Sequence, residues 1–562
     1  MYNIVELFSG IGSQLKALQN LGSEPEVVAT CEWDVHAIIA YDLIHNDAVI
    51  PDDIARMNKE SLLEELNKFT FSNSGKEALD YTSLKTYSVD VLRHLLNAIR
   101  RNRNYVDINA MDGGNLPDNI DILTYSFPCQ DLSNVGAFHG YNLGIDRDSG
   151  SRSSLLWQVG RILSELQNGN KRLPRFLLME NVPTLLSERH FPNFSAWIEQ
   201  LKGLGYVSKY YPLNAADFGL PQNRPRLLMI SVFVGDNKGE IELIHEYFGN
   251  TTAEKVIEDY RHSDFFRQWT IKDLLRTDYT KQSVFEEAIE CTPNDTVSRR
   301  KIWEDNPQII LQGNIFNEKI NMIRTITTKQ DRNPNSGNLY FDCGISGRSK
   351  FRYLTPRECL LFMGFTDRDY INLATNNLEF HKGDALFTRD KIIRLAGNSI
   401  PVKLLEGIFL QIMKIDALLK DYRQCSFAVS GGHSVKKVHA KQITKFMFAH
   451  GIRCRKPGGQ YPENPDVIFP RYKVALFIYD CVQHGHNCDN SSIPEKNRDF
   501  WRNRIKDIAE RDHAAHKELA VQGWHVLIVW KCELNKDNFG ATMKRLETRI
   551  RECISSVSES AV

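Results

Sequence analysis

The stretch SFPCQDLS, at residues 126–133, directly follows the apolar run IDILT at 120–124. That run has the length and composition of a buried parallel strand. A proline and then a cysteine after the strand end place the thiol of Cys129 at the carboxyl edge of an open α/β sheet, where such sheets bind ligands. Free cysteine is also a common small buried residue, so the interpretation of Cys129 depends on the motifs around it.

The composition is that of an ordinary globular protein. The 562 residues suffice for roughly three to four domains, and 42% of them are hydrophobic and 25% charged. We find no apolar stretch of membrane-spanning length, and residues 1–6 are typical of a strand rather than of a signal peptide. The 11 cysteines are scattered and odd in number, which favours a reducing cytoplasm where thiols act as ligands or nucleophiles. We therefore expect a cytoplasmic protein without a membrane partner.

Net charge is unevenly distributed along the chain. Residues 423–562 hold 23 Lys and Arg against 15 Asp and Glu, a net charge of +8. Because the whole chain is neutral, residues 1–422 carry −8. A basic C-terminal segment on an acidic body is typical of contact with a polyanion, although a solvated surface without a ligand can have the same composition.

The first residues predict a ligand-binding turn. A strand at 2–8 leads into the turn Ser9–Gly12, a helix is expected at 13–21, and a second strand at 26–30 ends at Glu32 and Trp33. Glycines let the backbone approach a ligand closely, and an acid about 20 residues after such a turn can hold ribose hydroxyls. A short Gly-x-Gly turn is also common in purely structural roles, so this motif needs support from others.

Further motifs lie at the ends of predicted strands or helices. They are VDI at 106–108, ENVP at 180–183, QNRPR at 222–226 and GNSIPV at 397–402. Together with FSGIG at 8–12, FPCQ at 127–130 and FRYLTPREC at 351–359, their order and spacing resemble the cytosine carbon-5 DNA methyltransferases over roughly residues 1–420. The resemblance implies an α/β, Rossmann-like S-adenosylmethionine-dependent methyltransferase with a target-recognition region.

The resemblance also implies a covalent mechanism. Carbon 5 of cytosine becomes nucleophilic only after a nucleophile adds to carbon 6, and Cys129 would supply the thiolate. Glu180 would hydrogen-bond N3 and the exocyclic amine as an acid, and Arg226 would hold the ring O2. Arg224 would support Glu180 or contact the phosphate of the target nucleotide. The implied partner is double-stranded DNA, from which the cytosine is flipped out; no obligatory protein partner is evident.

A site for S-adenosylmethionine follows from the same resemblance. Glu32 would hold the ribose hydroxyls, Phe8 and Trp33 would flank the adenine, and Asp107 would accept from its amine. The implied cofactor set is Phe8, Gly10, Gly12, Glu32, Trp33, Asp107, Ile108, Asn398 and Val402. The family has GDI where this chain has VDI, and Asp90 lies in a similar local pattern, so it stays an alternative to Asp107.

The expected domain boundaries follow from these motifs. They are a catalytic core at 1–232 with a helical insert at about 48–104, a target-recognition region at 233–323, core completion at 324–420, a linker at 421–435, and a second domain at 436–562. The target-recognition region contains Arg299, Arg300, Lys301 and Trp303, which suit contacts with base edges and phosphates. The linker is expected because the stretch 426–433 has the composition of a loop.

The remaining residues predict a second α/β domain. Strands are expected at 466–469, 473–478 and 525–530, and a helix at 495–521. Two cysteines and a histidine lie within eight residues, and another cysteine follows the last strand, which suits a closed tetrahedral zinc site. The predicted ligands are Cys481, His486, Cys488 and Cys532.

This second domain resembles the very-short-patch repair endonucleases, which have a restriction-endonuclease-like fold. The resemblance rests on PDVIF at 465–469, on residues 481–488, and on GWHVLIVWKC at 523–532. It implies a catalytic Mg²⁺ on Asp466 and a general base or acid at His484, with Asp480 as a further candidate. It also implies a prokaryotic enzyme acting at the nucleoid.

The domain departs from that family at several positions. Val482 and Gln483 stand where the family has two aromatics that wedge into DNA beside a mismatch. Ala440 stands where an early acid is expected, and Tyr479 where a His or Asp is common, although Asp480 can compensate. We therefore expect the fold and the zinc site to be kept, and mismatch recognition to be weakened.

Four hypotheses remain for the whole chain. The first is restriction–modification, in which methylation protects sites that the nuclease cuts. The second is repair of T·G mismatches, and the third is a catalytically inactive, zinc-stapled DNA-binding module. The fourth, methylation of RNA, is disfavoured because an RNA-type relative would need little of the large region at 233–323.

Overall fold

The chain folds into two compact units in the computed structural model, one at 1–416 and one at 417–562. The structure describes residues 2–129, 132, 144–146, 152–330, 337–381, 383–458, 461–488, 491 and 498–558, with backbone alone at 424–438, 499–500 and 554–558. Gln130, Asp131 and Ser133 of the 126–133 stretch therefore lie outside the described residues. Each unit is described in turn.

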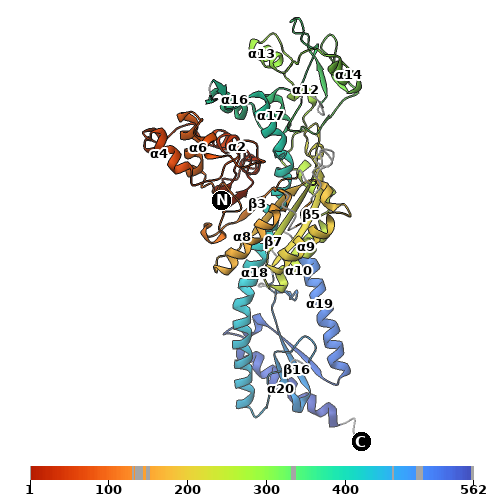
Figure 1. Cartoon of the computed structure of the whole chain (residues 1–562). Coiled ribbons are helices and arrows are strands. Elements are labelled where there is room, and N and C mark those ends of the chain that lie inside the picture. The colour runs from red at the N-terminus through yellow and green to blue at the C-terminus, as the bar shows by residue number, and fades with distance from the viewer. Residues whose placement is uncertain are drawn as a thin grey trace. The chain divides into compact units, whose positions relative to one another are not determined.

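A six-stranded sheet in the order β2-β1-β3-β4-β7-β5 forms the centre of the first unit (Figure 1). Its strands are β1 (Asn3–Leu7), β2 (Glu26–Cys31), β3 (Ile122–Tyr125), β4 (Phe176–Asn181), β5 (Tyr206–Asn214) and β7 (Pro225–Phe233). The pairs among β2, β1, β3 and β4 are parallel, whereas β7 runs antiparallel to both β4 and β5. The strands predicted next to the motifs are all present, which confirms the Rossmann-like α/β fold.

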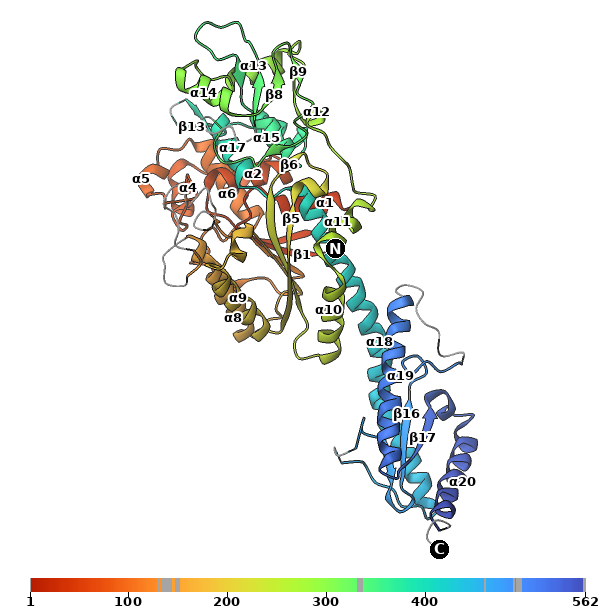
Figure 2. The ribbon, with the colours of Figure 1, turned by 90° about the vertical axis from the view of Figure 1, so that its right-hand side faces the viewer.

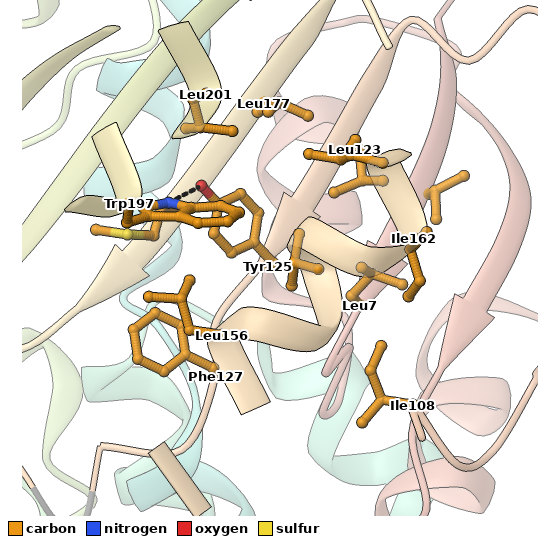
Figure 3. Close-up of a cluster of buried hydrophobic side chains, with 14 of the residues drawn as sticks. Leu7, Ile108, Leu123, Tyr125, Phe127, Leu156, Ile162, Leu177, Trp197 and Leu201 are labelled. Atoms are coloured by element: carbon orange, nitrogen blue, oxygen red, sulfur yellow. Dashed lines mark hydrogen bonds between the residues drawn. The ribbon is translucent and has the colours of Figure 1, made fainter. Parts of the chain in front are cut away.

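Helices α8 (Leu156–Asn168) and α9 (Phe191–Gly203) pack on one face of this sheet. Side chains at alternate strand positions, Leu7, Leu123, Tyr125 and Leu177 among them, point into the core between the sheet and these helices (Figure 3). Within this core the indole Nε1 of Trp197 donates to the hydroxyl of Tyr125 over 3.1 Å, so the polar atoms of both side chains are paired (Figure 3).

The insert at 48–104 is helical, as its composition predicts. After α1 (Ser13–Asn20) and α2 (Val35–His45), it forms α3 (Asp52–Ala55), α4 (Lys59–Leu66), α5 (Tyr81–Leu84) and α6 (Val89–Arg101). The strongly amphipathic α6 begins at Ser88, whose side chain accepts from the backbone N–H of Val91. Its apolar face packs on α2 and α4, and the insert is therefore built onto the methyltransferase-like core.

The region expected to recognise the target forms a small helical and β-sheet layer. Its helices are α10 (Lys238–Asn250), α11 (Ala253–Arg261), α12 (Ile271–Leu274), α13 (Gln282–Glu290) and α14 (Val297–Asp305). Its four-stranded sheet, β12-β11-β8-β9, comprises β8 (Gln308–Leu311), β9 (Ile315–Phe316), β11 (Asn338–Tyr340) and β12 (Phe351–Arg352). This sheet crosses the expected boundary at 323, because β8 pairs with β11.

Short elements then complete the first unit. They are β6 (Gln222–Asn223), β10 (Ile323–Arg324), α15 (Pro356–Phe362), α16 (Asp367–Thr375), β13 (Glu379–His381), β14 (Asp384–Ala385) and α17 (Arg389–Asn398). Helix α15 begins with a capping box, in which Thr355 and Glu358 exchange side-chain and backbone hydrogen bonds. The next helix, α18 (Val402–Ala449), contains the predicted closing helix at 404–418 but does not end there. The loop expected at 426–433 and the linker expected at 421–435 are instead helical backbone.

The second unit is a three-stranded sheet covered by helices. Strands β15 (Val467–Phe469), β16 (Val474–Tyr479) and β17 (His525–Trp530) lie in that order, with β15 antiparallel and β17 parallel to β16. Helix α19 (Arg498–Val521) connects β16 to β17 and packs on one face of the sheet. Helix α20 (Phe539–Ser558) and the end of α18 pack on the other face (Figure 2). The predicted strands and helix are confirmed, although 492–497 lie outside the described residues.

No described helix of either unit combines the length and the apolar composition that a membrane crossing requires.

Candidate active site and metal centre

The register of the large sheet brings the predicted catalytic residues to one edge. Leu7 pairs with Tyr125, and Tyr125 pairs with Met179, so the segments that follow β1 and β3 leave the sheet together with Glu180 of β4. Arg226 reaches the same edge from the opposite direction, because β7 is antiparallel to β4. Strand pairing thus brings together three residues that are far apart in sequence, Cys129, Glu180 and Arg226.

The loop that carries Cys129 is fixed by hydrogen bonds to its backbone. Asn181, next to Glu180, donates from Nδ2 to the carbonyl of Phe127 over 3.0 Å, and the Ser153 hydroxyl donates to the carbonyl of Pro128 over 2.6 Å. Both donors act directly before Cys129, so they hold the thiol at the edge of the sheet. Sequence reasoning assigned no role to Ser153, whose neighbours carry no motif of their own.

Glu180 and Arg226 form a partly buried ion pair beside the thiol. The Nε of Arg226 lies 2.8 Å from the Oε1 of Glu180, and both side chains are 12% exposed. Burial raises the pKa of the Glu180 carboxyl, and the charges of Arg226 and Arg224 offset this only in part. A carboxyl group with a raised pKa can serve as a proton donor near neutral pH.

Burial also determines the direction in which the pKa of the Cys129 thiol is shifted. It raises the pKa of the thiol, and the charge of Arg226 acts in the opposite direction while that of Glu180 adds to the increase. The thiol is therefore mainly protonated before a substrate is bound. Arg226 is the nearest source of positive charge to favour the thiolate.

Arg224 makes its hydrogen bonds to backbone, while its charge acts on Glu180 as predicted for a supporting residue. Its guanidinium is buried and donates to three carbonyls: Ile326 over 2.7 Å, Gly397 over 2.8 Å and Ser399 over 2.7 Å. At 1% exposure it is not available to a phosphate, and its hydrogen bonds join two backbone segments. Arg224 is therefore a positioning residue that joins the end of α17 to the segment after β10.

A cavity of about 390 Å³ lies beside this cluster and matches the predicted cofactor site. It is lined by five of the nine predicted cofactor residues: Phe8, Glu32, Trp33, Asp107 and Ile108. Pro128, directly before Cys129, lines it too, so the cavity reaches the loop of the predicted nucleophile. The aromatic side chains of Phe8 and Trp33, together with the carboxyl groups of Glu32 and Asp107, suit an adenosine.

The four other predicted cofactor residues do not line the cavity. Gly10 donates its backbone N–H to Glu32 over 3.0 Å, and Gly12 has a φ of +77° with a tight approach to His45, which only glycine allows. Asn398 ends α17, and Val402 begins α18 with its N–H donated to Met363. Of these four residues, Gly10 is joined to the cavity through its hydrogen bond to Glu32.

Glu32 is held by backbone donors from its own segment and from the turn that follows β1. Its carboxylate accepts from the N–H groups of Gly10, Trp33 and Asp34 at 2.9–3.0 Å. Burial and the nearby Asp34 carboxylate nevertheless raise the pKa of Glu32 to about 7. The side chain of Asn104, which no motif pointed to, pairs with both the N–H and the carbonyl of Glu32 over 3.0 Å.

In the second unit, the four predicted zinc ligands come together. The ligand atoms of Cys481, His486, Cys488 and Cys532 all lie within 4.8 Å of one another, and the Nδ1 of His486 is 3.4 Å from the Sγ of Cys532. A set of three thiols and one imidazole at this spacing fits a tetrahedral Zn²⁺. The ring of His486 also stacks on Trp530, which fixes its orientation.

Around the predicted nuclease residues, His484 has a clear partner. Its Nδ1 lies 2.6 Å from the Oδ2 of Asp512, a residue on α19 whose role the sequence did not reveal. The ring of Tyr479 stacks on His484 with centroids 3.9 Å apart, and the Tyr479 hydroxyl lies 2.7 Å from the Nε2 of His516. A carboxylate on Nδ1 fixes the tautomer of His484 and favours proton transfer at its other nitrogen.

The two predicted metal acids make other contacts. Asp466 accepts the backbone N–H of Ile478 over 2.7 Å, and Asp480 accepts the N–H groups of Val482 and Gln483 and pairs with Lys531 at 3.3 Å. Among the described residues, the cysteine–histidine cluster is the one group of three or more His, Cys, Asp or Glu positioned to hold a metal. Because Mg²⁺ is typically held by one or two carboxylates together with water and substrate phosphates, a Mg²⁺ ion on Asp466 stays a prediction.

Comparison with known proteins agrees with both predicted resemblances. Residues 86–414 match the family of C-5 cytosine-specific DNA methylases, and residues 416–490 match the family of the DNA mismatch endonuclease Vsr. The first match spans more than half of the chain.

Three curated relatives illustrate the two parts. The chain is 30% identical over 413 residues to the orphan methyltransferase M.SssI of Spiroplasma monobiae, an alignment covering 73% of this chain and 96% of the relative. It is 36% identical over 127 residues to the type II nicking enzyme V.NmeAIP of Neisseria meningitidis, covering 22% of this chain and 89% of that enzyme. It is 30% identical over 121 residues to the DNA mismatch endonuclease Vsr of Escherichia coli, covering 22% and 77%. The chain therefore belongs to the C-5 cytosine-specific DNA methylases and carries, after the methylase, a Vsr-type endonuclease domain.

Proposed function

We propose that the first unit transfers a methyl group from S-adenosylmethionine to carbon 5 of a flipped-out cytosine in a specific duplex sequence, with Cys129 as covalent nucleophile. The observation that carries this proposal is the Glu180–Arg226 ion pair beside Cys129, in a loop whose Pro128 lines the same cavity as Phe8, Glu32 and Trp33. A thiol, an acid and a cation are the three groups that activation of a pyrimidine ring requires.

In this mechanism Cys129 adds to carbon 6 of the ring. A carbon–sulfur bond forms, the 5,6 double bond opens, and the electron pair becomes available at carbon 5. Glu180 donates a proton to N3, and Arg226 stabilises the negative charge that develops on O2. Once carbon 5 carries the methyl group, a base takes the proton from that carbon, the C–H electron pair restores the 5,6 double bond, the Cys129 sulfur leaves as a thiolate, and Glu180 takes back the proton from N3.

The cavity supplies the positioning for the cofactor. When bound, S-adenosylmethionine provides the methyl group as an electrophile. Trp33 and Phe8 offer aromatic faces to the adenine, Glu32 offers acceptors to the ribose hydroxyls, and Asp107 offers one to the adenine amine. The same cavity reaches Pro128, which brings the cofactor end of the site to the Cys129 loop.

The raised pKa of Glu32 predicts a pH dependence of cofactor binding. Below a pKa of about 7 the carboxyl is neutral, and above it the carboxylate is the stronger acceptor for ribose hydroxyls. The affinity for S-adenosylmethionine should therefore rise about tenfold between pH 6 and pH 8. Titration calorimetry at several pH values measures this change.

Glu32→Gln keeps an acceptor oxygen and removes the titration, so it should flatten the pH profile. Glu26→Gln, at the exposed start of the same strand, serves as the matched control and should keep the wild-type profile. A profile that persists in Glu32→Gln would assign the titration to another group.

For the whole chain we propose restriction–modification, in which the methylase protects sites that the second unit cuts. Support comes from the fusion itself, from the His484–Asp512 pair, and from Val482 and Gln483 in place of mismatch-wedging aromatics. The Cys481–His486–Cys488–Cys532 group would hold structural Zn²⁺ and stabilise the loop that carries His484. The relatives named as nicking and mismatch enzymes make T·G repair the second candidate.

Cleavage of matched duplexes distinguishes these hypotheses. The full chain should cut duplex DNA that contains its unmethylated recognition sequence and leave the methylated duplex and the T·G duplex intact. His484→Ala and Asp512→Asn should each reduce cutting by about 10²-fold or more, because both remove the oriented proton-transfer group. Asp507→Asn, an exposed acid on the same helix as Asp512, should cut as the wild type does.

Cutting confined to the T·G duplex would support repair and contradict restriction. The absence of cutting on all three duplexes, with methylation intact, would indicate an inactive DNA-binding module.

A further inference from the structure

One helix of the first unit contacts a residue next to the cofactor cavity, Asp34, and the positioning residue Arg224 beside the catalytic cluster. Near the middle of α17, Arg394 pairs with Asp34 through two contacts of 2.5 and 3.2 Å, and Asp34 directly follows Trp33 of the cavity. At its end, the carbonyls of Gly397 and Ser399 accept from Arg224. The two contacts are within five residues of each other along the chain.

The end of α17 is seated tightly against its neighbour. A side chain at Gly397 would place its Cβ 2.6 Å from the carbonyl carbon of Thr327, so only glycine fits there. Arg224 also donates to Ile326, next to this contact. A shift of α17 would therefore move the backbone that Arg224 joins, two residues from Arg226 of the catalytic cluster.

The cofactor side of the contact is built by the helical insert. The backbone N–H of Ser72 donates to the carbonyl of Trp33 over 2.8 Å, and the N–H of Val35 donates to the carbonyl of Ser72 over 2.9 Å. The Ser72 hydroxyl accepts from the N–H of Gly75 over 2.9 Å, and Gly75 lines the cavity. The insert thus contributes to the cavity wall and holds the backbone on either side of Asp34.

A second contact ties the same turn of the insert to α17. Lys391 donates from Nζ to the carbonyl of Asn73 over 3.1 Å, one turn before Arg394. The hydroxyl of Tyr87 reaches the Oδ1 of Asn73 from within the insert. A continuous series of hydrogen bonds and one ion pair therefore connects the cavity wall at Gly75 with Asp34 and with α17.

The Asp34–Arg394 pair is well placed to transmit a displacement. The two side chains are 7% and 15% exposed, so solvent screens their attraction little. Although burial alone would raise the pKa of Asp34, the hydrogen bond from His36 and the charge of Arg394 lower it to about 2. Asp34 therefore stays charged over the physiological pH range, and removing Arg394 would leave this buried carboxylate without its cation.

We propose that the Asp34–Arg394 ion pair is a positioning contact that couples occupancy of the cofactor cavity to the catalytic cluster, and that the insert at 48–104 exists in part to hold its cofactor side. This inference rests on the proposed methyltransferase function. A bound cofactor that orders Trp33 and Asp34 favours one position of α17, and through Arg224 it favours the placement of Arg226 that a flipped-out cytosine requires. By linkage, DNA then tightens the binding of the cofactor by the same factor.

The test measures the affinity for S-adenosylmethionine with and without duplex DNA that the wild type methylates. Cys129→Ser serves as the background so that no turnover occurs. In this background we expect DNA to tighten cofactor binding about fivefold or more. Arg394→Met and Asp34→Asn should each bring the ratio of the two cofactor affinities close to one. The double variant should reduce this ratio no further than either single variant does, because all three variants remove the same contact.

Two further variants separate coupling from folding. Arg394→Lys keeps the charge and should retain part of the ratio, and Asp390→Asn, an exposed acid on α17 that pairs with Arg389, should retain all of it. Thermal unfolding confirms that each variant is folded at the assay temperature.

A ratio of one in the Cys129→Ser background, or an unchanged ratio in Arg394→Met, would overturn the inference. If the wild type neither binds the cofactor nor methylates DNA, the proposed function fails instead, and the two failures are therefore distinguishable.

Discussion

Cys129→Ser is expected to abolish methyl transfer while leaving the cofactor site intact. The hydroxyl of serine is a far weaker nucleophile toward carbon 6 than a thiolate. The other cysteine at this edge, Cys31 at the end of β2, is buried, and burial raises the pKa of its thiol. We expect the rate to fall by about 10³-fold or more, which corresponds to at least about 4 kcal/mol of lost transition-state stabilisation. Transfer of labelled methyl groups to duplex DNA measures the rate.

The control for this variant is cofactor binding. Cys129 does not line the cavity of Phe8, Glu32 and Trp33, so calorimetry should give the wild-type affinity for S-adenosylmethionine. A second control is Cys343→Ser, a partly buried cysteine in the target-recognition layer, which should keep full activity. Methylation that survives in Cys129→Ser would contradict the covalent mechanism.

Arg224→Met is expected to cause the largest loss of stability among the motif residues. The substitution removes three hydrogen bonds from a buried guanidinium and leaves the carbonyls of Ile326, Gly397 and Ser399 without this donor. Hydrogen bonds from charged donors contribute about 1.5–3 kcal/mol each, but their losses overlap, so we expect the free energy of unfolding to fall by about 3–5 kcal/mol. Denaturant unfolding of the full chain measures this quantity.

Arg226→Met is the matched comparison, because the two arginines are two residues apart and differ in their surroundings. Arg226 is paired with a carboxyl whose pKa is already raised, and it lies at the open edge of the sheet. Its loss should reduce methylation strongly and stability only slightly. Equal destabilisation by the two variants would contradict the assignment of Arg224 as the structural member of the pair.

Much of the catalytic cluster could be predicted because its residues follow strands. The positions of Cys129 and Glu180 follow from local strand signals and from the rule that parallel strands present their carboxyl ends at one edge. The zinc group could be predicted for a similar reason, since three of its four ligands lie within eight residues. In these cases a local pattern and a general packing rule together determine the geometry.

The residues that the sequence did not reveal act across long distances in the chain. Arg394 meets Asp34 across 360 positions, and Arg224 meets Gly397 across 173. Neither pairing has a periodic or spacing signal, and the motif that contains Arg224 suggested support of Glu180 or a contact with the target phosphate, not a contact with backbone. Asn104 and Asp512 were missed likewise, because each acts through a partner that only folding brings near.

The boundaries between domains were harder to predict than the elements themselves. The glycines within 426–433 suggested a loop. A glycine inside a helix costs only about 1 kcal/mol, however, and α18 continues through this stretch because helix-forming residues lie on both sides of it. The expected boundary at 323 separated β8 from β11, which pair in one sheet. Strand pairing between non-adjacent segments has no signature in local composition.

Bisulfite sequencing of DNA from a host that expresses the chain tests the central claim most directly, because it reports which cytosines carry a methyl group at carbon 5. Wild-type protein should give methylated cytosines within one shared sequence, and the Cys129→Ser protein, expressed at the same level, should give none. Methylated cytosines in the Cys129→Ser host, or no shared methylated sequence with the wild type, would contradict the account.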